Sequence, residues 1–282
     1  MKIAIASGKG GTGKTTVAVN LALVAAAGGR EVRLLDCDVE EPNAHIFLAP
    51  AIEKRIPVSV PVPKVDTARC NACGECGKLC EYSAIVTLGS KPLVFPELCH
   101  GCGGCALVCP QQAISEVPRE AGVVEIGRAG RLLFVGGRLR VGEAMSPPLI
   151  REVKRRAGAD SLAIVDAPPG TSCPVIAAVR GCDYVILVTE PTPFGMHDLI
   201  LAVETVRKLG QGFGVVVNRS DIGDDRVTRY CAEQGIDLLA EIPDDRRIAE
   251  AYSRGEPVVR ALPEYAELFA KLLESAEKGG AA

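Results

Sequence analysis

Apolar residues in this sequence gather in short continuous runs, and the longer segments between several of these runs repeat apolar side chains with helical periodicity. The runs that predict buried strands are residues 2–6, 31–36, 161–166, 184–189, 213–217 and 238–242. The segments that predict helices are residues 16–27, 146–157 with Ser146 as N-cap, 196–209, 224–234 and 263–277. Strands that are apolar on both faces need helices on both sides. The pattern therefore predicts an α/β fold with a doubly wound, mostly parallel sheet, on which the last helix docks.

A glycine-rich stretch, GKGGTGKT at residues 8–15, joins the first strand to the first helix. Its glycines match the dinucleotide pattern G-x-G-x-x-G, with Asp36 ending the next strand, and also the triphosphate pattern G-x-x-x-x-G-K-[ST]. The second pattern also demands Lys14 and Thr15, so we expect a nucleoside triphosphate, with Lys14 on the outer phosphates and Thr15 on Mg²⁺. The residues expected to bind nucleotide here are Gly8, Gly10, Gly11, Thr12, Gly13, Lys14, Thr15 and Thr16.

Acidic residues end two of the predicted strands. Asp36 and Asp38 lie two residues apart at one strand end, so both can face a bound metal and phosphate. Asp166 ends a fully apolar strand, where P-loop enzymes hold Mg²⁺ through water, and the loop APPGTS that follows can sense the outer phosphate. Cys37, between the two acids, points the other way and is expected in the core.

Eight of the twelve cysteines form two runs with the spacing C-x2-C-x2-C-x3-C. The runs are Cys70, Cys73, Cys76 and Cys80, then Cys99, Cys102, Cys105 and Cys109. The spacing resembles that of bacterial two-cluster ferredoxins, in which three cysteines of one run and the fourth of the other hold each [4Fe-4S] cluster. The resemblance implies Cys70, Cys73, Cys76 and Cys109 for one cluster, and Cys80, Cys99, Cys102 and Cys105 for the other. Structural zinc is the alternative, although it leaves the third and fourth cysteines of each run unexplained.

The cysteine runs divide the chain. A proline-punctuated stretch, PVSVPVPK at 57–64, predicts an extended strand or polyproline linker, and short strands are expected at 123–126 and 132–135. We therefore predict an inserted α+β, ferredoxin-like domain at residues 61–118. The P-loop domain would comprise residues 1–60 and 119–282.

Composition narrows the possible partners. A net charge of −3, with six Phe, five Tyr and no Trp, argues against nucleic-acid binding. No apolar run reaches the length of a membrane-spanning helix, so we expect no membrane insertion and a cytoplasmic protein. Residues 128–156 carry eight Lys or Arg against Glu143 and Glu152, which indicates either a solvated face or a dock for an acidic partner.

Taken together, these segments resemble the MinD/Mrp-type P-loop ATPases that carry an inserted ferredoxin domain, relatives of the nitrogenase iron protein and of ParA. The motifs that carry the resemblance are KGGTGKT, DCDVEEPN, the two cysteine runs, VDAPPGTSCP, TEPTPFG, VVVNRSD and EIPDD. It implies ATP, Mg²⁺ and a dimer, formed with itself or with a related ATPase, in which Lys9 reaches the phosphates of the other subunit. It also implies that Asp38 orients the attacking water and that Asp36 and Asp166 belong to the Mg²⁺ shell.

The same resemblance implies that Asn218 contacts the base and that Pro243 and Asp244 lie at the nucleotide. Residues 218–221, NRSD, are also similar to a guanine-reading pattern, so GTP stays open. Cys173 lies where the nitrogenase iron protein has one ligand of a cluster shared between subunits, but the sequence favours a buried or incidental thiol, because a shared cluster needs a second cysteine per subunit.

The function expected is an ATPase that couples nucleotide-dependent dimer closure to a two-cluster redox module and a redox or client partner. The module would serve electron transfer or the assembly of iron-sulfur and other metallocofactors. A redox-sensing scaffold that hydrolyses ATP slowly, as in MinD and ParA, is the alternative, and carriage of the clusters as cargo is a third possibility.

Overall fold

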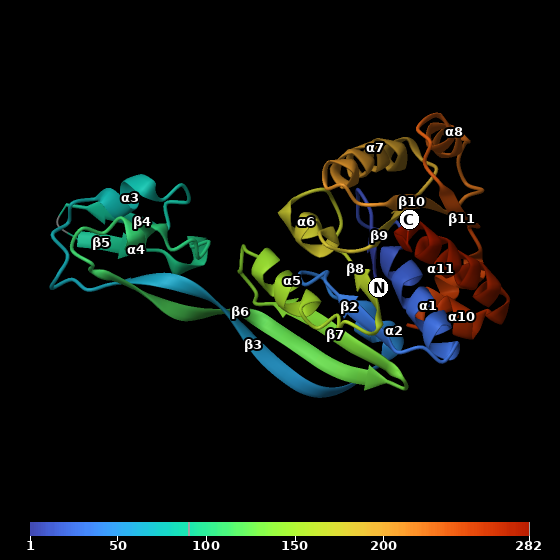
Figure 1. Ribbon diagram of the computed structural model, residues 1–282, viewed down its shortest axis with the longest axis horizontal. Coiled ribbons are helices and arrows are strands. Elements are labelled where there is room, and N and C mark those ends of the chain that lie inside the picture. The colour runs from blue at the N-terminus through green and yellow to red at the C-terminus, as the bar shows by residue number, and fades with distance from the viewer. Residues whose placement is uncertain (90, 282) are drawn as a thin grey trace.

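The protein is built on a nine-stranded sheet with the order β11-β10-β9-β1-β8-β2-β7-β6-β3 (Figure 1). The computed structural model describes residues 1–89 and 91–281. The parallel strands are β1 (Lys2–Ala6), β2 (Val32–Asp36), β7 (Leu132–Leu139), β8 (Leu162–Asp166), β9 (Tyr184–Thr189), β10 (Phe213–Asn218) and β11 (Leu238–Ile242). Two antiparallel strands complete one edge, β6 (Ile114–Ala129) and β3 (Ala51–Val65). The predicted mostly parallel α/β sheet is confirmed.

Helices cover both faces of the sheet because successive strand residues point to opposite sides. Ala4 packs into one apolar core with Leu35 and Val165, whereas its neighbours Ile3 and Ile5 pack into the other. The helices on the first face are α5 (Pro147–Lys154), α6 (Cys173–Val179), α7 (Pro193–Lys208) and α8 (Arg226–Glu233). Those on the second are α1 (Lys14–Ala27), α2 (Ala44–Leu48), α9 (Arg246–Ser253), α10 (Val258–Ala261) and α11 (Ala266–Ala281), the last preceded by a 3-10 turn at Pro263–Tyr265. The expected docking of the last helix on the sheet is confirmed.

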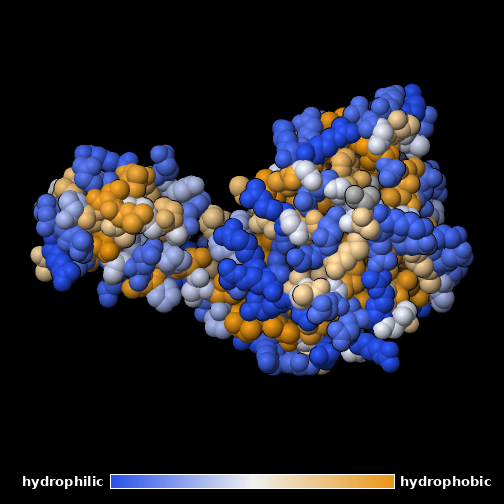
Figure 2. Space-filling model, viewed as in Figure 1, coloured by the Kyte–Doolittle hydropathy of each residue, from blue (hydrophilic) through white to orange (hydrophobic). Residues whose placement is uncertain are grey.

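Strands β3 and β6 continue beyond the body as an antiparallel ribbon that ends in a small lobe (Figures 1 and 2). The lobe contains α3 (Glu75–Leu79), β4 (Ile85–Leu88), β5 (Lys91–Val94), a 3-10 turn at Pro96–Leu98 and α4 (Gly104–Leu107). The stretch 57–64, expected to be strand or polyproline, is strand, and the short strand expected at 123–126 is part of the longer β6. The proposed boundaries after residues 60 and 118 fall inside β3 and β6, so the division into domains stays a prediction.

All five predicted helices differ from their expected limits by one to four residues at one or both ends, and the physical reason is clear at the start of α1 and of α5. Helix α1 begins at Lys14 rather than at residue 16, because Gly13, with φ of 95°, ends the loop directly before it. Helix α5 spans Pro147–Lys154, shorter than expected, and Ser146 makes no side-chain capping hydrogen bond. Ser146 is buried with helical backbone angles, so its hydroxyl is not presented to the free N–H groups of the first turn as an extended N-cap residue would present it.

None of the helices within residues 1–89 and 91–281 combines the length and the apolar composition needed to cross a bilayer.

Leu149 on α5 fixes this helix against β6 and β7. A Cβ atom at Gly122 would come within 2.9 Å of the Leu149 side chain and one at Gly137 within 3.3 Å, so glycine at both positions leaves room for the leucine. We expect Leu149→Ala to lower the free energy of unfolding by about 2–5 kcal/mol, because the cavity cannot close around the smaller side chain. Urea denaturation followed by circular dichroism measures the change. Leu201→Ala, at a side chain 41% exposed on α7, is the control and should shift stability by about 0.5 kcal/mol or less; equal losses would contradict this packing.

Candidate nucleotide site and cysteine lobe

The glycine loop lies at the carboxyl edge of the parallel strands. It connects β1 to α1, and the neighbouring strands β8 and β2 end there in Asp166 and Asp36. These two aspartates are register partners, and Asp166 also pairs with Ile5 of β1. The sheet thus brings the predicted phosphate loop and two predicted Mg²⁺ residues together, at the edge where open α/β sheets bind ligands.

Lys14 and Asp166 face each other in a buried setting. Burial lowers the pKa of Lys14, whereas the nearby carboxylates of Asp166 and Asp38 raise it. Burial likewise raises the pKa of Asp166 to about 7, against the opposing effects of the Thr15 hydroxyl and Lys14. Among the residues that the structure describes, neither carboxyl oxygen of Asp166 has a hydrogen-bond partner, and the buried Thr12 hydroxyl has none either. Buried polar atoms without partners are costly, and a hydrated Mg²⁺ with phosphate oxygens is the chemistry that satisfies them.

Asp36 and Asp38 make different contacts. The Asp36 carboxylate is fully buried and accepts hydrogen bonds from the backbone N–H groups of Asp38 (3.2 Å) and Ala44 (3.1 Å), so it orders the loop that leads to α2. Burial, and then the charge of Asp166, raise the pKa of Asp36 well above its usual value. Burial raises the pKa of Asp38 to about 6, while Lys14 lowers it. Asp38 therefore lies within electrostatic reach of Lys14, and the roles expected for both aspartates stay predictions.

Lys9 pairs with a carboxylate of its own chain. Its Nζ lies 3.1 Å from Glu190, which is buried and also accepts a hydrogen bond from Arg219 at 3.1 Å. Arg219 in turn lies 3.6 Å from Asp244. Glu190 was not predicted as a site residue, although the TEPTPFG motif contains it.

A cavity of about 170 Å³ adjoins the phosphate loop and brings together four predicted nucleotide residues, Thr16, Asn218, Pro243 and Asp244. The Asn218 amide donates a 2.8 Å hydrogen bond to the Thr12 carbonyl, which fixes β10 to the loop. A Cβ at Gly13 would lie 2.5 Å from the Asn218 amide nitrogen, so glycine is required for this close approach. The lining residues that were not predicted as nucleotide-binding are Arg219, Ile242, Asp245, Ile248, Ala249, Tyr252, Val258 and Phe269, of which Arg219, Ile242 and Asp245 belong to the NRSD and EIPDD motifs.

The eight cysteines of the two runs line two separate cavities in the lobe. One cavity is lined by Cys70, Cys73, Cys76 and Cys109. The other is lined by Cys80, Cys99, Cys102 and Cys105. Each set joins three cysteines of one run to the fourth of the other, the distribution implied by the resemblance to two-cluster ferredoxins.

The surroundings of these cavities suit thiolate ligands. Backbone N–H groups donate to sulfur at Cys70 (3.4 Å), Cys99 (3.4 Å) and Cys109 (3.3 Å). The Tyr82 ring stacks on His100 with centroids 3.4 Å apart, and both line the second cavity. Within residues 1–89 and 91–281 no three Cys, His, Asp or Glu side chains converge on one metal-ion position. In a cubane each iron has its own thiolate, so the four cysteines that hold a cluster need not converge on one point.

The remaining cysteines are separate from the lobe. Cys37, Cys182 and Cys231 are buried in the core of the body, as expected for Cys37. Cys173 is exposed at the first residue of α6.

Comparison with known proteins identifies the family. Residues 3–258 match the family described as the CobQ/CobB/MinD/ParA nucleotide binding domain. The chain belongs to this family. The glycine loop, Asp166 and Asn218 all lie within the matched residues.

Relatives within the family extend over nearly the same length. The uncharacterized protein MJ0578 of Methanocaldococcus jannaschii is 34% identical over 226 residues, which is 79% of this chain and 80% of that protein. An iron-sulfur cluster carrier protein of Pyrococcus horikoshii is 27% identical over 99% of this chain and 89% of its own length. The fold matches that of the septum site-determining protein MinD of Pyrococcus horikoshii, solved with Mg-ADP, with a TM-score of 0.63 at 23% identity over 98% of this chain and 96% of that one.

Proposed function

We propose that this protein is an ATP-hydrolysing iron-sulfur protein in which nucleotide-dependent dimer closure acts on a module holding two [4Fe-4S] clusters. The module serves electron transfer or the assembly of iron-sulfur and other metallocofactors. The observation that carries the proposal is the division of eight cysteines between two cavities of four, in a lobe joined to a nucleotide-binding body. The iron-sulfur cluster carrier relative from Pyrococcus horikoshii, similar over almost the whole chain, supports the same reading.

ATP suits the base cavity better than GTP. In a guanine-reading site the aspartate of the N-K-x-D pattern must be free to accept from the base. Here Asp221 is not one of the described residues that line the base cavity; its carboxylate accepts a 2.6 Å hydrogen bond from the Asp244 backbone N–H, and Arg219 replaces the lysine and pairs with Glu190 and Asp244. Competition of ATP and GTP against a fluorescent ADP tests the preference, and equal displacement would contradict it.

The ribbon gives a mechanical path between the two parts. Strands β3 and β6 run from the lobe into the sheet beside β7, and β7 pairs with β2, which ends in Asp36. Conformational changes in the loops that follow Asp36 and Asp166 are therefore transmitted through β2 and β7 to the end of β6 that lies in the sheet. Allosteric coupling is reciprocal, so nucleotide and cluster oxidation state should influence each other. Equal cluster potentials with and without ATP would refute the coupling.

The lobe surface supports contact with a redox or client protein. Figure 2 shows apolar residues gathered on the small lobe. Leu79 and Leu107 are exposed on α3 and α4, the helices that carry Cys76 and Cys105, and Leu107 is 86% exposed. Exposed apolar patches of this kind on small domains mark interaction sites.

The cluster content is tested by anaerobic purification of the full chain with iron and sulfide counting and electron paramagnetic resonance. Two cubanes require about eight irons and about eight sulfides per chain. A zinc-filled protein would refute the iron-sulfur half of the proposal and leave the nucleotide half intact.

Lys9 carries the dimer part of the proposal. Its ion pair with Glu190 holds the ammonium group beside the phosphate loop, 30% exposed and therefore within reach of a second subunit. We expect Lys9→Ala to bind nucleotide within about threefold of the wild type but to hydrolyse it at least about tenfold more slowly, because one charged contact to the other subunit's phosphates is lost. Phosphate release and light scattering with Mg-ATP measure both effects. Lys208→Ala, at an exposed lysine on α7, is the control, and unchanged hydrolysis in Lys9→Ala would contradict the shared site.

A switch without substrate chemistry is the second candidate, favoured by the fold shared with MinD. In that case hydrolysis stays slow in the reduced protein and rises only when a partner protein is added. If the protein instead carries its clusters as cargo, this chain should lose clusters while an acceptor protein that lacks them gains them.

A further inference from the structure

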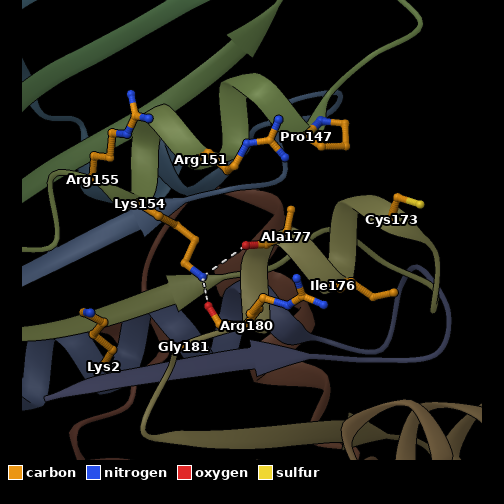
Figure 3. A pocket seen from close by; sticks show the side chains of 10 residues that line it. All are labelled: Lys2, Pro147, Arg151, Lys154, Arg155, Cys173, Ile176, Ala177, Arg180 and Gly181. Carbon is orange, nitrogen blue, oxygen red and sulfur yellow. Dashed lines mark hydrogen bonds between the residues drawn. The ribbon is translucent and has the colours of Figure 1, made fainter. Parts of the chain in front are cut away.

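A basic cavity opens between α5 and α6, apart from the nucleotide site and the cysteine lobe (Figure 3). Its volume is about 540 Å³, within the range of pockets that bind small ligands. Five cationic side chains line it: Lys2, Arg151, Lys154, Arg155 and Arg180. No carboxylate does, and the rest of the lining is largely small or apolar, including Pro147 and Ile176. Three of the cations come from the basic stretch 128–156, which the sequence left as either a solvated face or a dock.

The charges in this cavity are poorly compensated. Arg155 pairs with Glu152, and the Asp183 carboxylate accepts a 2.7 Å hydrogen bond from the Lys2 backbone N–H, but across residues 1–89 and 91–281 no carboxylate forms an ion pair with the side chain of Lys2, Arg151 or Arg180. Like charges gathered around a concave surface repel one another and raise the local concentration of anions. Arginine is also suited to two-pronged recognition of carboxylate and phosphate groups.

We propose that this cavity binds a small, multiply charged oxyanion, either a polycarboxylate or a phosphate ester, and that its occupancy is coupled to the nucleotide state. The cationic rim recognises the charged groups, while Pro147 and Ile176 contact the carbon skeleton. The cavity size favours such a molecule over a folded protein surface.

The coupling follows from how α6 is connected. Helix α6 begins at Cys173, directly after the loop 167–172 that follows Asp166. Lys154 ties α5 to the far end of α6 by donating hydrogen bonds to the carbonyls of Ala177 (3.1 Å) and Arg180 (2.6 Å) (Figure 3). A shift of the loop on binding the outer phosphate therefore displaces the start of α6, which carries the lining residues Cys173 and Ile176, while Lys154 holds the far end of α6 to α5.

Calorimetric titration of the full-length protein with citrate and with pyrophosphate tests the site. The protein is first saturated with Mg-ADP, so that pyrophosphate cannot enter the phosphate loop, and free Mg²⁺ is held constant because both probes chelate it. We expect at least one probe to bind, and Arg151→Gln with Arg180→Gln to weaken it at least about tenfold. Binding of citrate alone would identify a polycarboxylate and binding of pyrophosphate alone a phosphate ester. The control pair is Arg140→Gln with Arg229→Gln, two exposed arginines outside the cavity.

Two outcomes overturn the proposal. If neither probe binds, or if the cavity pair and the control pair weaken binding equally, the cavity is not an oxyanion site. Repeating the titration with a non-hydrolysable ATP analogue in place of ADP tests the coupling, for which we expect an affinity change of at least about fivefold. Equal affinities would overturn the coupling. Neither result depends on metal in the lobe, so cluster content and this site succeed or fail separately.

Discussion

Substituting Lys14 with glutamine is expected to reduce ATP hydrolysis by a factor of about 100 to 1,000 and to weaken nucleotide binding markedly. Lys14 is 7% exposed and lies beside Asp166 and Asp38 at the start of α1, where the outer phosphates of a triphosphate must sit. Glutamine keeps most of the length but removes the charge, so the phosphates lose a buried cation and face two uncompensated carboxylates. Phosphate release with Mg-ATP and calorimetric nucleotide binding measure the two effects.

The variant must also be shown to fold. Removing the charge of Lys14 leaves Asp166 and Asp38 facing each other, so thermal denaturation without nucleotide should be recorded alongside activity. Lys208→Gln, at an exposed lysine on α7, is the matched control and should retain both binding and hydrolysis. Full activity in a folded Lys14→Gln protein would show that the phosphate loop is not the catalytic site.

Local sequence patterns predicted the glycine loop and the two cysteine runs because each pattern depends on residues close together in the chain. The spacing of Gly8, Gly13 and Lys14 specifies a strand, a tight turn and a helix N-terminus without reference to the rest of the fold. The ends of two strands, at Asp36 and Asp166, could be predicted because an apolar run stops at an acidic residue in each case. Parallel neighbours then bring those ends to one edge of the sheet.

Contacts between distant segments were not predictable in the same way. Val58 of β3 pairs with Gly122 of β6, and no periodicity within either strand specifies its partner. For the same reason the long ribbon was predicted only as a linker and a short strand. Glu190 pairs with Lys9, and Tyr252 lines the base cavity with Asn218, through contacts between segments that are far apart in the chain.

Replacing Cys109 with alanine is expected to remove the same cluster as replacing Cys70, although they belong to different runs. Both line one cavity in the lobe, whereas Cys80 lines the other together with Cys99. Each single variant should retain about four of about eight irons per chain, because a cubane that lacks one of its four thiolates is not retained. Iron and sulfide counting after anaerobic purification, with electron paramagnetic resonance of the reduced protein, measures the loss.

Double variants decide between crossed and separate ligand sets. With crossed sets, Cys70→Ala with Cys109→Ala leaves about four irons, and Cys70→Ala with Cys80→Ala leaves about none. If each run held its own cluster, these two results would be exchanged, because Cys70 and Cys80 would then share one site. Cys173→Ala, at the exposed thiol on α6, should keep the full iron content and serves as the control. The comparison depends only on which cysteines bind the same cluster. It therefore tests the ligand arrangement in the lobe independently of the function of the clusters.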